Sequence, residues 1–436
     1  MGSLTPLLVI VVVIAIVYAL TRKKRTQPLV RDVSRLARGS QSVDVVTETI
    51  EPEGGPFKEH HRRKVVRDAR LLPKPGRRQR HRNRKKLFDA ASAARRFSLT
   101  MRCKDRTLGV LAADSEQLER FGLPAWNTEQ QLADSLALTL GQLRHFSMHR
   151  IAERTPHYVT FEVPKRSGGV RLIHAPKRRL KAVQRKLLAL LVDKLPVHDA
   201  AHGFRHDRSI RTCAEPHVGK RVILKLDVKD FFPSLTFARI RGYLVAMGYG
   251  YDVSTTIACL CTESERQPVE VAGELLHVPV GPRRAPQGAP TSPGLSNAIC
   301  HRLDRRLSGL ARAHGFTYAR YADDLTFSGD RTDLVGKLRA RAVAVLRSEG
   351  FEPNTGKTRV MRKGGAQRVT GVTVNRVLGL SRGERRKLRA ELHRAMHAPS
   401  LDTAEKRRLS GRIAYVRMLN PEQAAALLRK AAKLYG

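Results

Sequence analysis

Regular patterning of hydrophobic and polar positions begins near Asn127 and continues along the rest of the chain. A helical period starts there, and Thr128 with Gln131 predicts a capping box at its first turn. The leucines that follow this period are Leu132, Leu136, Leu140 and Leu143. We therefore expect folded structure from this point, opening with helix.

Short strands and helices are predicted downstream. Tyr158–Val163 and Val170–His174 are two β-rich runs around a Ser167–Gly169 turn, which predicts a β-hairpin. The other expected elements are a helix over about 177–195, strands over 222–228, 316–321 and 325–328, and a small helical region from about Leu380. The tight turn between the last two strands holds Asp323 and Asp324.

The N-terminal segment is apolar without a break, apart from Tyr18, from Leu7 to Leu20, and the basic cluster Arg22–Arg25 follows directly. A bilayer span needs about 17–25 residues, and residues 4–20 reach the lower limit. Positive charges after the apolar run predict a single-pass anchor over residues 1–20, with the rest of the chain cytoplasmic and tethered to the inner face of the cell membrane. The alternatives are an apolar terminal helix or a start codon assigned too early.

Charge separates the next segment from the folded part. Residues 21–96 lack apolar periodicity and contain a dense basic run at 77–86, which predicts a disordered basic linker. Over the whole chain, 82 Lys and Arg stand against 39 Asp and Glu, a formal net charge of +43. Such a field attracts polyanions, so nucleic acid is the expected partner. A hydrophobic content of 41% excludes a wholly disordered tail.

The five cysteines are scattered and form neither a disulfide framework nor paired CxxC motifs. This usage is typical of a reducing cytoplasm. We expect Cys259 and Cys261 to be buried packing residues rather than metal ligands.

Acidic residues are scarce, and two acidic sites stand out. Asp227 ends an apolar strand, and Asp323-Asp324 lies in the tight turn. Neighbouring carboxylates repel unless a cation neutralises them. Three carboxylates on adjacent strands can hold two hard cations about 3.5–4 Å apart. The alternative is a solvated strand end and an ordinary turn, so this interpretation needs independent support.

Ordered motifs supply that support. Tyr321–Asp324 (YADD) resembles the YxDD signature of reverse transcriptases. Four other blocks occur in the family's order: 165–176 resembles the fingers hairpin, 227–232 motif A, 286–293 motif B and 350–358 motif D. Two further blocks resemble those of bacterial retron reverse transcriptases, namely the NAxxH pattern at Asn297–His301 and the VTG triplet at Val369–Gly371. The resemblance extends from about Leu123 to Gly436, whereas the first hundred residues depart from it.

The resemblance implies roles residue by residue. Asp227, Asp323 and Asp324 are implied metal ligands with the Val228 carbonyl, binding two Mg²⁺ ions, with Mn²⁺ as an alternative. Lys357 is the implied acid that protonates pyrophosphate. The implied nucleotide-binding residues are Lys165, Arg171, Phe232, Gln287 and Gly288, with Phe232 as an aromatic gate against the ribose 2′-OH. The implied RNA-binding residues are Asn297, His301, Val369, Thr370 and Gly371. Each has a structural alternative: surface charge, core packing or an ordinary loop.

The implied architecture is an α+β right-hand polymerase fold with fingers, an antiparallel palm sheet and a helical thumb. We place the N-terminal helices and fingers at 97–220, the palm at 221–375 and the thumb at 376–436. The implied activity copies a cognate non-coding RNA from dNTPs into branched RNA-linked single-stranded DNA. Synthesis starts at a guanosine 2′-OH, passes through an RNA–DNA duplex and serves anti-phage defence with an effector protein.

Two alternatives stay open. A group II intron-like reverse transcriptase predicts a maturase segment after the thumb, which the sequence up to Gly436 does not contain. A catalytically inactive, membrane-tethered RNA-binding scaffold accounts for the charge but does not require an intact acidic triad.

Overall fold

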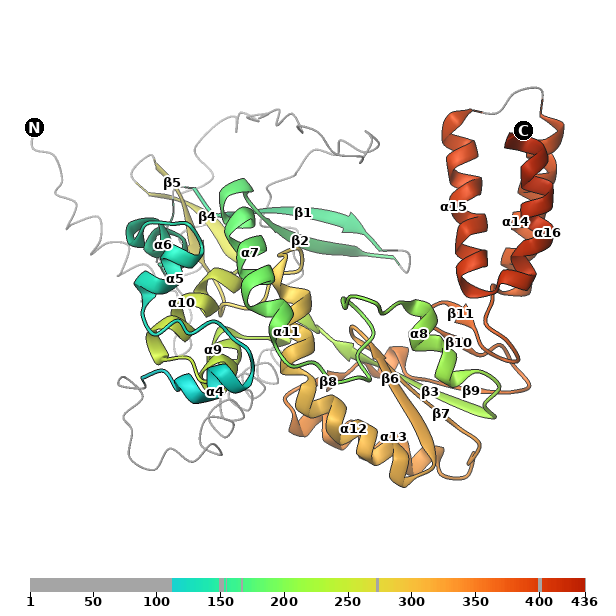
Figure 1. Ribbon diagram of the computed structural model, residues 1–436, viewed down its shortest axis with the longest axis horizontal. Coiled ribbons are helices and arrows are strands. Elements are labelled where there is room, and N and C mark those ends of the chain that lie inside the picture. Colours follow the sequence, from blue (N-terminus) through green and yellow to red (C-terminus); the bar gives the residue numbers. More distant parts are fainter. Residues whose placement is uncertain are drawn as a thin grey trace, which may run out of the picture. The chain divides into compact units, whose positions relative to one another are not determined.

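The computed structural model describes residues 112–148, 153, 155–165, 168–271, 274–398 and 402–435 (Figure 1). The predicted anchor over 1–20 and the predicted basic linker over 21–96 lie outside these ranges. Within them, no helix is long and apolar enough to cross a bilayer. The chain divides into two compact units, and the smaller one takes residues 149–156 and 265–281 from the folded part.

The smaller unit contains an antiparallel hairpin of β4 (Arg266–Val271) and β5 (Glu274–Pro279). Glu153 adds to it through backbone hydrogen bonds with His277 in both directions.

The first helices of the larger unit are α4 (Ser115–Arg120), α5 (Glu129–Ser135) and α6 (Leu140–Ser147). The predicted capping box of Thr128 and Gln131 is confirmed at the start of α5. The leucine period is nevertheless split between two helices. Thr139 forms a second capping box at the start of α6. Ala137, between the two helices, has a φ of +54°, which is not helical and so separates α5 from α6.

The predicted hairpin is confirmed as β1 (Tyr158–Pro164) and β2 (Val170–Pro176), paired antiparallel from Tyr158↔Pro176 to Pro164↔Val170. The next helix is shorter than its pattern indicates. α7 (Arg178–Leu190) ends early, and Val192–Lys194 forms a separate 3-10 turn.

The central sheet is antiparallel, with β3 (Val222–Lys229) between β7 on one side and β8 and β9 on the other. β6 pairs with the outer side of β7. The bounds of these partners are β6 (Phe316–Tyr321), β7 (Asp324–Gly329), β8 (Glu352–Pro353) and β9 (Arg359–Arg362). β3 is therefore an inner strand that is hydrogen-bonded along both edges, as β7 is.

Alternation along β3 decides which side chains face the core. The β3 residues that belong to the main hydrophobic core are Val222, Leu224, Leu226 and Val228. Ile223 belongs to a second cluster on the other face. Side chains two positions apart share a face of a strand, so Lys225 and Asp227 lie on the Ile223 side.

Helices α12 (His301–Ala313) and α13 (Val335–Ser348) pack together and supply Leu303, Leu307 and Leu338 to the main core (Figure 1). The other helices of this unit are α8 (Ile210–Ala214), α9 (Phe237–Ala246), α10 (Tyr251–Cys261) and α11 (Thr291–Ile299). Cys259 and Cys261 are buried free thiols of α10, which confirms their packing role.

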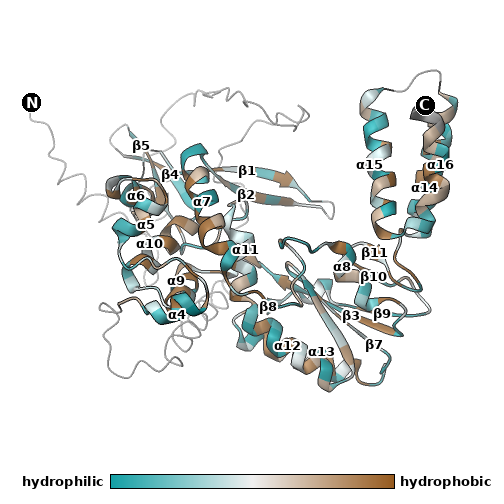
Figure 2. Ribbon diagram, in the orientation of Figure 1, coloured by the Kyte–Doolittle hydropathy of each residue, from teal (hydrophilic) through white to brown (hydrophobic). Residues whose placement is uncertain are grey.

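Three C-terminal helices follow: α14 (Arg382–His397), α15 (Thr403–Leu419) and α16 (Pro421–Tyr435). Leu388, Leu409 and Val416 form part of a core of their own. Figure 2 shows hydrophobic and hydrophilic residues alternating around these helices, as expected for amphipathic helices that bury one face. Ser381 and Glu384 form the capping box that begins α14.

Candidate active site

The structure brings the three predicted acidic residues together. Asp227 of β3 and Asp324 of β7 are direct cross-strand partners, so their side chains share one face of the sheet. The Val228 N–H donates to the Asp323 carbonyl at 2.9 Å. Two local predictions were wrong: β3 continues two residues past Asp227 to Lys229, and Asp324 is the first residue of β7 rather than part of the turn.

The turn between β6 and β7 therefore consists of Ala322 and Asp323. Ala322 has a φ of +55°, a conformation that hairpins usually assign to glycine, Asn or Asp. A non-glycine residue persists there only where its surroundings fix it. The Ala322 carbonyl accepts a hydrogen bond from Nη1 of Arg320 at 3.2 Å, which is one such restraint.

Two lysines engage the carboxylates. Lys357 Nζ donates to Asp227 Oδ2 at 3.0 Å, and Lys225 Nζ lies 2.8 Å from Asp324 Oδ2. Burial raises the pKa of Asp323, and the charges of Asp324 and Asp227 raise that pKa further. The hydrogen bond to Asp227 is the main cause of the raised pKa of Lys357. The cluster therefore concentrates negative charge that attracts cations.

The donor set fits a hard divalent cation, since Asp227 and Asp324 are cross-strand partners, Asp323 adjoins them in the turn and carboxylate oxygens suit such ions. Over the described ranges, no group of three or more His, Cys, Asp and Glu side chains is arranged as a formed metal site. The ammonium groups of Lys357 and Lys225 form ion pairs with Asp227 and Asp324, and so supply positive charge where a metal cation is expected. Val228 presents its backbone beside them and buries its side chain in the core.

Lys165 and Arg171 lie at the exposed end of the β1–β2 hairpin. The Lys165 N–H donates to the Gly169 carbonyl at 2.9 Å, which fixes the end of the hairpin but leaves both side chains in solvent.

Gln287 and Gly288 pack against the same hairpin. The Gln287 carbonyl accepts from the His174 N–H at 2.9 Å. Gly288 has a φ of +129°, and a Cβ there would lie 2.8 Å from the His174 carbonyl oxygen. The backbone at this glycine thus approaches β2 closely, and this contact alone accounts for the residue type.

Phe231 and Phe232 lie beyond the strand, because β3 ends at Lys229 and Asp230 has a φ of +49°. The two rings still have different environments. Phe231 is 5% exposed and stacks on Phe351 with ring centres 6.0 Å apart. Phe232 opens a 3-10 turn and is half-buried, and its ring centre lies 5.5 Å from that of Phe231 and 6.2 Å from that of Phe204.

Asn297 corrects the prediction of a direct RNA contact. Its side chain is fully buried in α11, and Nδ2 donates to the Gly203 carbonyl at 2.7 Å while Oδ1 accepts from Arg320 Nη1 at 3.0 Å. Arg320 is itself fully buried and forms an ion pair with Asp304 at 2.7 Å. Both ends of the amide are used inside the protein, so Asn297 supports the strand before the acidic turn.

The remaining predicted RNA-binding residues divide by exposure. Val369 is fully buried, so its side chain packs rather than contacts RNA. Thr370 and Gly371 form the two-residue turn between β10 (Arg368–Val369) and β11 (Val372–Thr373), with φ of +49° and +85°. Positive φ at both positions is typical of a type I′ hairpin turn and requires a residue such as Gly371. His301 begins α12, is half-buried and meets the His198 ring edge-on at 5.8 Å.

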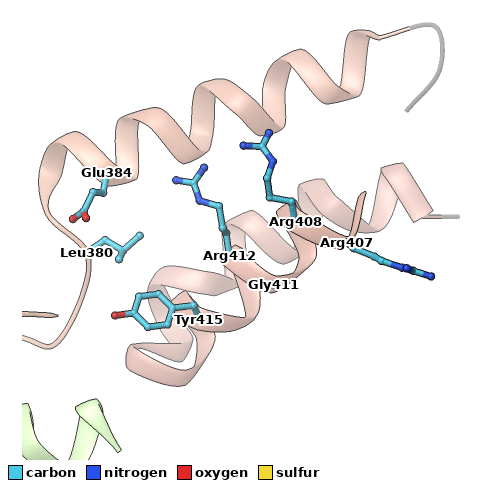
Figure 3. Close-up of a pocket in the computed structure, with 7 residues that line it drawn as sticks. All are labelled: Leu380, Glu384, Arg407, Arg408, Gly411, Arg412 and Tyr415. Atoms are coloured by element: carbon cyan, nitrogen blue, oxygen red, sulfur yellow. The ribbon is translucent and has the colours of Figure 1, made fainter. Parts of the chain in front are cut away.

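The C-terminal helices form a pocket of about 330 Å³ between α14 and α15 (Figure 3). Its lining is Leu380, Glu384, Arg407, Arg408, Gly411, Arg412 and Tyr415. Arg408 and Arg412 point toward α14 in Figure 3, and both pair with Glu391. Much of the positive charge of this pocket is therefore compensated within the helices.

Sequence reasoning missed Lys225 and the buried pair of Arg320 and Asp304. Lys225 was detectable, because it stands two positions before Asp227 on the same strand and so shares its face. Arg320 directly precedes the YADD motif, but nothing in a single sequence distinguishes a buried arginine in so basic a chain.

The sheet topology and the paired acidic strands define a polymerase of the reverse transcriptase class. Residues 163–381 match the family model described as "Reverse transcriptase (RNA-dependent DNA polymerase)". The chain is 61% identical over 387 residues to the Retron Mx65 reverse transcriptase of Myxococcus xanthus, covering 89% of this chain and 90% of that protein. It is 43% identical to the Retron Mx162 reverse transcriptase of the same organism, covering 73% and 69%. The chain belongs to the retron reverse transcriptases.

A solved telomerase structure from Candida albicans is a more distant likeness, with 12% identity, a TM-score of 0.38 and coverage of 65% of this chain and 58% of that chain. As a member of its family, the protein is an RNA-directed DNA polymerase. Enzymes of this family use divalent metal ions and bind an RNA template and the duplex formed on it.

Proposed function

We propose that the protein copies a structured, cognate non-coding RNA into single-stranded DNA that stays joined to the RNA through a 2′–5′ branch. A guanosine 2′-OH of that RNA is the primer. The observation that carries the catalytic part is the pairing of Asp227 with Asp324 beside Asp323 on one face of the sheet. Membership in the retron family supports the choice of RNA and primer.

In this proposal Asp227, Asp323, Asp324 and the Val228 carbonyl hold two Mg²⁺ ions, with Mn²⁺ as the substitute. When bound, such a pair lowers the pKa of an attacking hydroxyl and stabilises the negative charge of the leaving pyrophosphate. The carboxylates are preorganised because β3 is hydrogen-bonded along both edges. Lys225 and Lys357 keep them from repelling each other before the cations arrive.

Lys357 has two parts in this scheme. Its ammonium group donates a hydrogen bond to Asp227, and this bond raises the pKa of the lysine and so holds the proton on it. Once the contact with Asp227 is broken, that restraint is removed, and the ammonium group donates a proton to the pyrophosphate oxygen as the bond to the α-phosphorus breaks. The side chain is 61% exposed, so it has room to move.

In this proposal, residues around the carboxylates select the nucleotide. Phe232, half-buried beside them, serves as the wall that a ribose 2′-OH would strike. Lys165 and Arg171 reach the triphosphate from the exposed end of the β1–β2 hairpin, and Gln287 borders the same hairpin. His301, Thr370 and Gly371 are the members of the predicted RNA-binding set with exposed or half-buried positions, and we assign recognition of the cognate RNA to them.

The catalytic proposal is tested by Asp323→Asn in primer extension with purified full-length protein. We expect loss of dNTP incorporation with RNA binding retained, because the substitution removes a charge from the centre and leaves the sheet intact. Asp333→Asn is the matched control, since Asp333 is a surface residue paired with Arg331. Normal incorporation by Asp323→Asn contradicts the metal assignment.

The priming proposal is tested by sequencing the nucleic acid that copurifies with the protein. We expect a short DNA joined to one RNA, with the joint cleaved by a 2′–5′ debranching enzyme. An in vitro reaction in which the priming guanosine carries a 2′-hydrogen should give no DNA. Random host RNA without attached DNA contradicts this proposal and supports the RNA-binding scaffold.

We further place this activity in defence against phage, with an effector protein as partner. A plaque assay in cells carrying the protein with its neighbouring genes provides the test. Protection should disappear with Asp323→Asn and persist with Asp333→Asn. Equal protection by both variants contradicts a role for DNA synthesis.

Localisation is proposed from the sequence alone: residues 4–20 tether the enzyme to the inner face of the cell membrane. We expect the full chain in the membrane fraction and Val12→Arg in the soluble fraction, because a central arginine costs about 2.5–3.5 kcal/mol on insertion scales. A wild-type chain that stays soluble contradicts the tether.

A further inference from the structure

Phe204 is an exposed aromatic residue in an unusual backbone conformation. Its side chain is 50% exposed, and its φ is +59°. Bulky residues rarely occupy the left-handed region, because that conformation is strained for a side chain with a Cβ. Half-exposed packing does not account for such a conformation, so the ring's position needs another explanation.

The segment that carries Phe204 is fixed to the strand before the acidic turn. The Arg320 N–H donates to the Ala200 carbonyl at 2.7 Å, and the His202 N–H donates back to the Arg320 carbonyl at 2.8 Å. Ala201 and Arg320 thus form a short parallel bridge along the edge of β6. Two backbone hydrogen bonds therefore join the loop to this strand.

Gly203 brings the loop into direct contact with the turn itself. A Cβ at Gly203 would lie 2.8 Å from the Ala322 nitrogen, so only glycine permits this approach. The Gly203 carbonyl is held by Asn297 Nδ2 at 2.7 Å. The next residue, Arg205, folds its side chain back, and its Nη1 donates to the Ala201 carbonyl at 3.2 Å. The backbone is therefore fixed directly before the strained residue.

This anchoring places the Phe204 ring between two residues that flank the carboxylates. Its centroid lies 6.2 Å from that of Phe232, with 45° between the planes, and 6.5 Å from that of Tyr321, with 43°. Phe232 follows Asp227 on the chain, and Tyr321 pairs with Asp324. Phe232 and Tyr321 are half-buried, so Phe204 presents the most exposed ring of the three.

We propose that Phe204 is a substrate-contacting residue whose ring packs against the sugar and base face of a nucleotide held at the carboxylates. The proposal rests on the proposed catalytic role of the acidic residues. Exposed aromatic rings stack on nucleotides of any sequence, which suits a polymerase that must accept every base. Two nucleotides meet at such a centre, the incoming dNTP and the terminal pair of the primer–template duplex, and both offer this apolar surface.

The test separates loss of the ring from loss of fold. Phe204→Asn removes the ring but keeps a residue that tolerates left-handed φ, and Phe204→Leu keeps an apolar side chain. Val377→Ala is the control, since Val377 is 52% exposed and lies before α14, outside the proposed site. Thermal unfolding of each full-length variant checks the fold, and Phe204→Asn should be at least as stable as the wild type.

Single-nucleotide extension on an RNA template with a DNA primer then gives KM for dNTP and kcat, and a fluorescence titration gives Kd for the primer–template. For Phe204→Asn we expect one of these two affinities to weaken by about tenfold to a hundredfold. A raised KM identifies the incoming nucleotide as the contact, and a raised Kd identifies the duplex. Phe204→Leu should recover part of the loss, and Val377→Ala should match the wild type.

Unchanged KM and unchanged Kd in a folded Phe204→Asn variant overturn the proposal. So does a fall in kcat alone, because a ring that only supports the turn affects the rate without affecting either affinity. Failure of the catalytic proposal has a different signature, namely an Asp323→Asn variant that still incorporates dNTP.

Discussion

The side-chain oxygen of Asn297 accepts a hydrogen bond from the buried guanidinium of Arg320 at 3.0 Å. Through this bond, α11 is connected to the end of β6, directly before the acidic residues. The same amide donates to Gly203, so one side chain links the helix, the strand and the loop that carries Phe204. We therefore expect Asn297 to affect catalysis through the backbone that it supports.

Asn297→Ala should lower extension of an ordinary primer–template as much as extension on the cognate RNA. Arg320 and Gly203 would each lose a partner in a dry environment, which costs about 1–3 kcal/mol. His301→Ala is the comparison, because His301 is half-buried and available to RNA; it should reduce only the cognate reaction. A selective cognate defect in a folded Asn297→Ala variant contradicts the supporting role.

Asp304→Ala should lower the free energy of unfolding by about 3–5 kcal/mol, because it leaves the Arg320 charge buried without its carboxylate. The double variant Asp304→Leu with Arg320→Met removes both charges and should be less destabilised than the single one. Urea denaturation followed by circular dichroism measures both. Equal losses in the two variants would mean that packing, rather than charge, dominates at this position.

Lys357→Met should reduce kcat for single-nucleotide addition by about 10²-fold and change KM for dNTP little, as expected on loss of a general acid. Rapid-quench kinetics in H₂O and D₂O provide the measurement, and the solvent isotope effect should shrink in the variant. Lys363→Met is the control, because Lys363 is an exposed lysine a few residues further along the chain. Full activity in Lys357→Arg would show that charge alone is required.

Stability should fall with pH below about 6.5 because of His217. This ring is fully buried and bonded to Ser328 at 2.6 Å, and burial lowers its pKa to about 3. The unfolded chain binds the proton first, so folding loses about 1.4 kcal/mol per pH unit between about 6.5 and the folded pKa. His217→Gln should remove one proton's share of this slope, about 1.4 kcal/mol per pH unit, between pH 6.5 and 5. His202, whose pKa burial lowers to about 4, keeps its own share, and the exposed His206→Gln should leave the slope unchanged. An unaltered slope in His217→Gln contradicts this.

Local elements could largely be predicted from the sequence, since hairpins and capping boxes depend on neighbouring residues. The Gly168–Gly169 turn and the box at Thr128 were both visible as patterns. The predicted ends of helices were wrong where a second local sequence signal was present. The leucine period continued across Ala137, but the capping box of Thr139 started a new helix.

The acidic residues could be selected by their motifs, whereas their partners could not. The contacts of Asp227 with Lys357 and of Asn297 with Arg320 join segments far apart in the chain, and periodicity carries no information about such pairs. The exposure of Phe204 is likewise invisible in a sequence, where an isolated phenylalanine indicates core packing.

The position of β3 also has a consequence for biosynthesis. This strand leaves the ribosome well before β7, β8 and β9, and every one of its hydrogen-bonded neighbours lies downstream. Until those strands emerge, Asp227 has no cross-strand partner and the carboxylates cannot meet. The nascent chain is therefore inert while it is being made, and the enzyme becomes competent only when translation has passed β9.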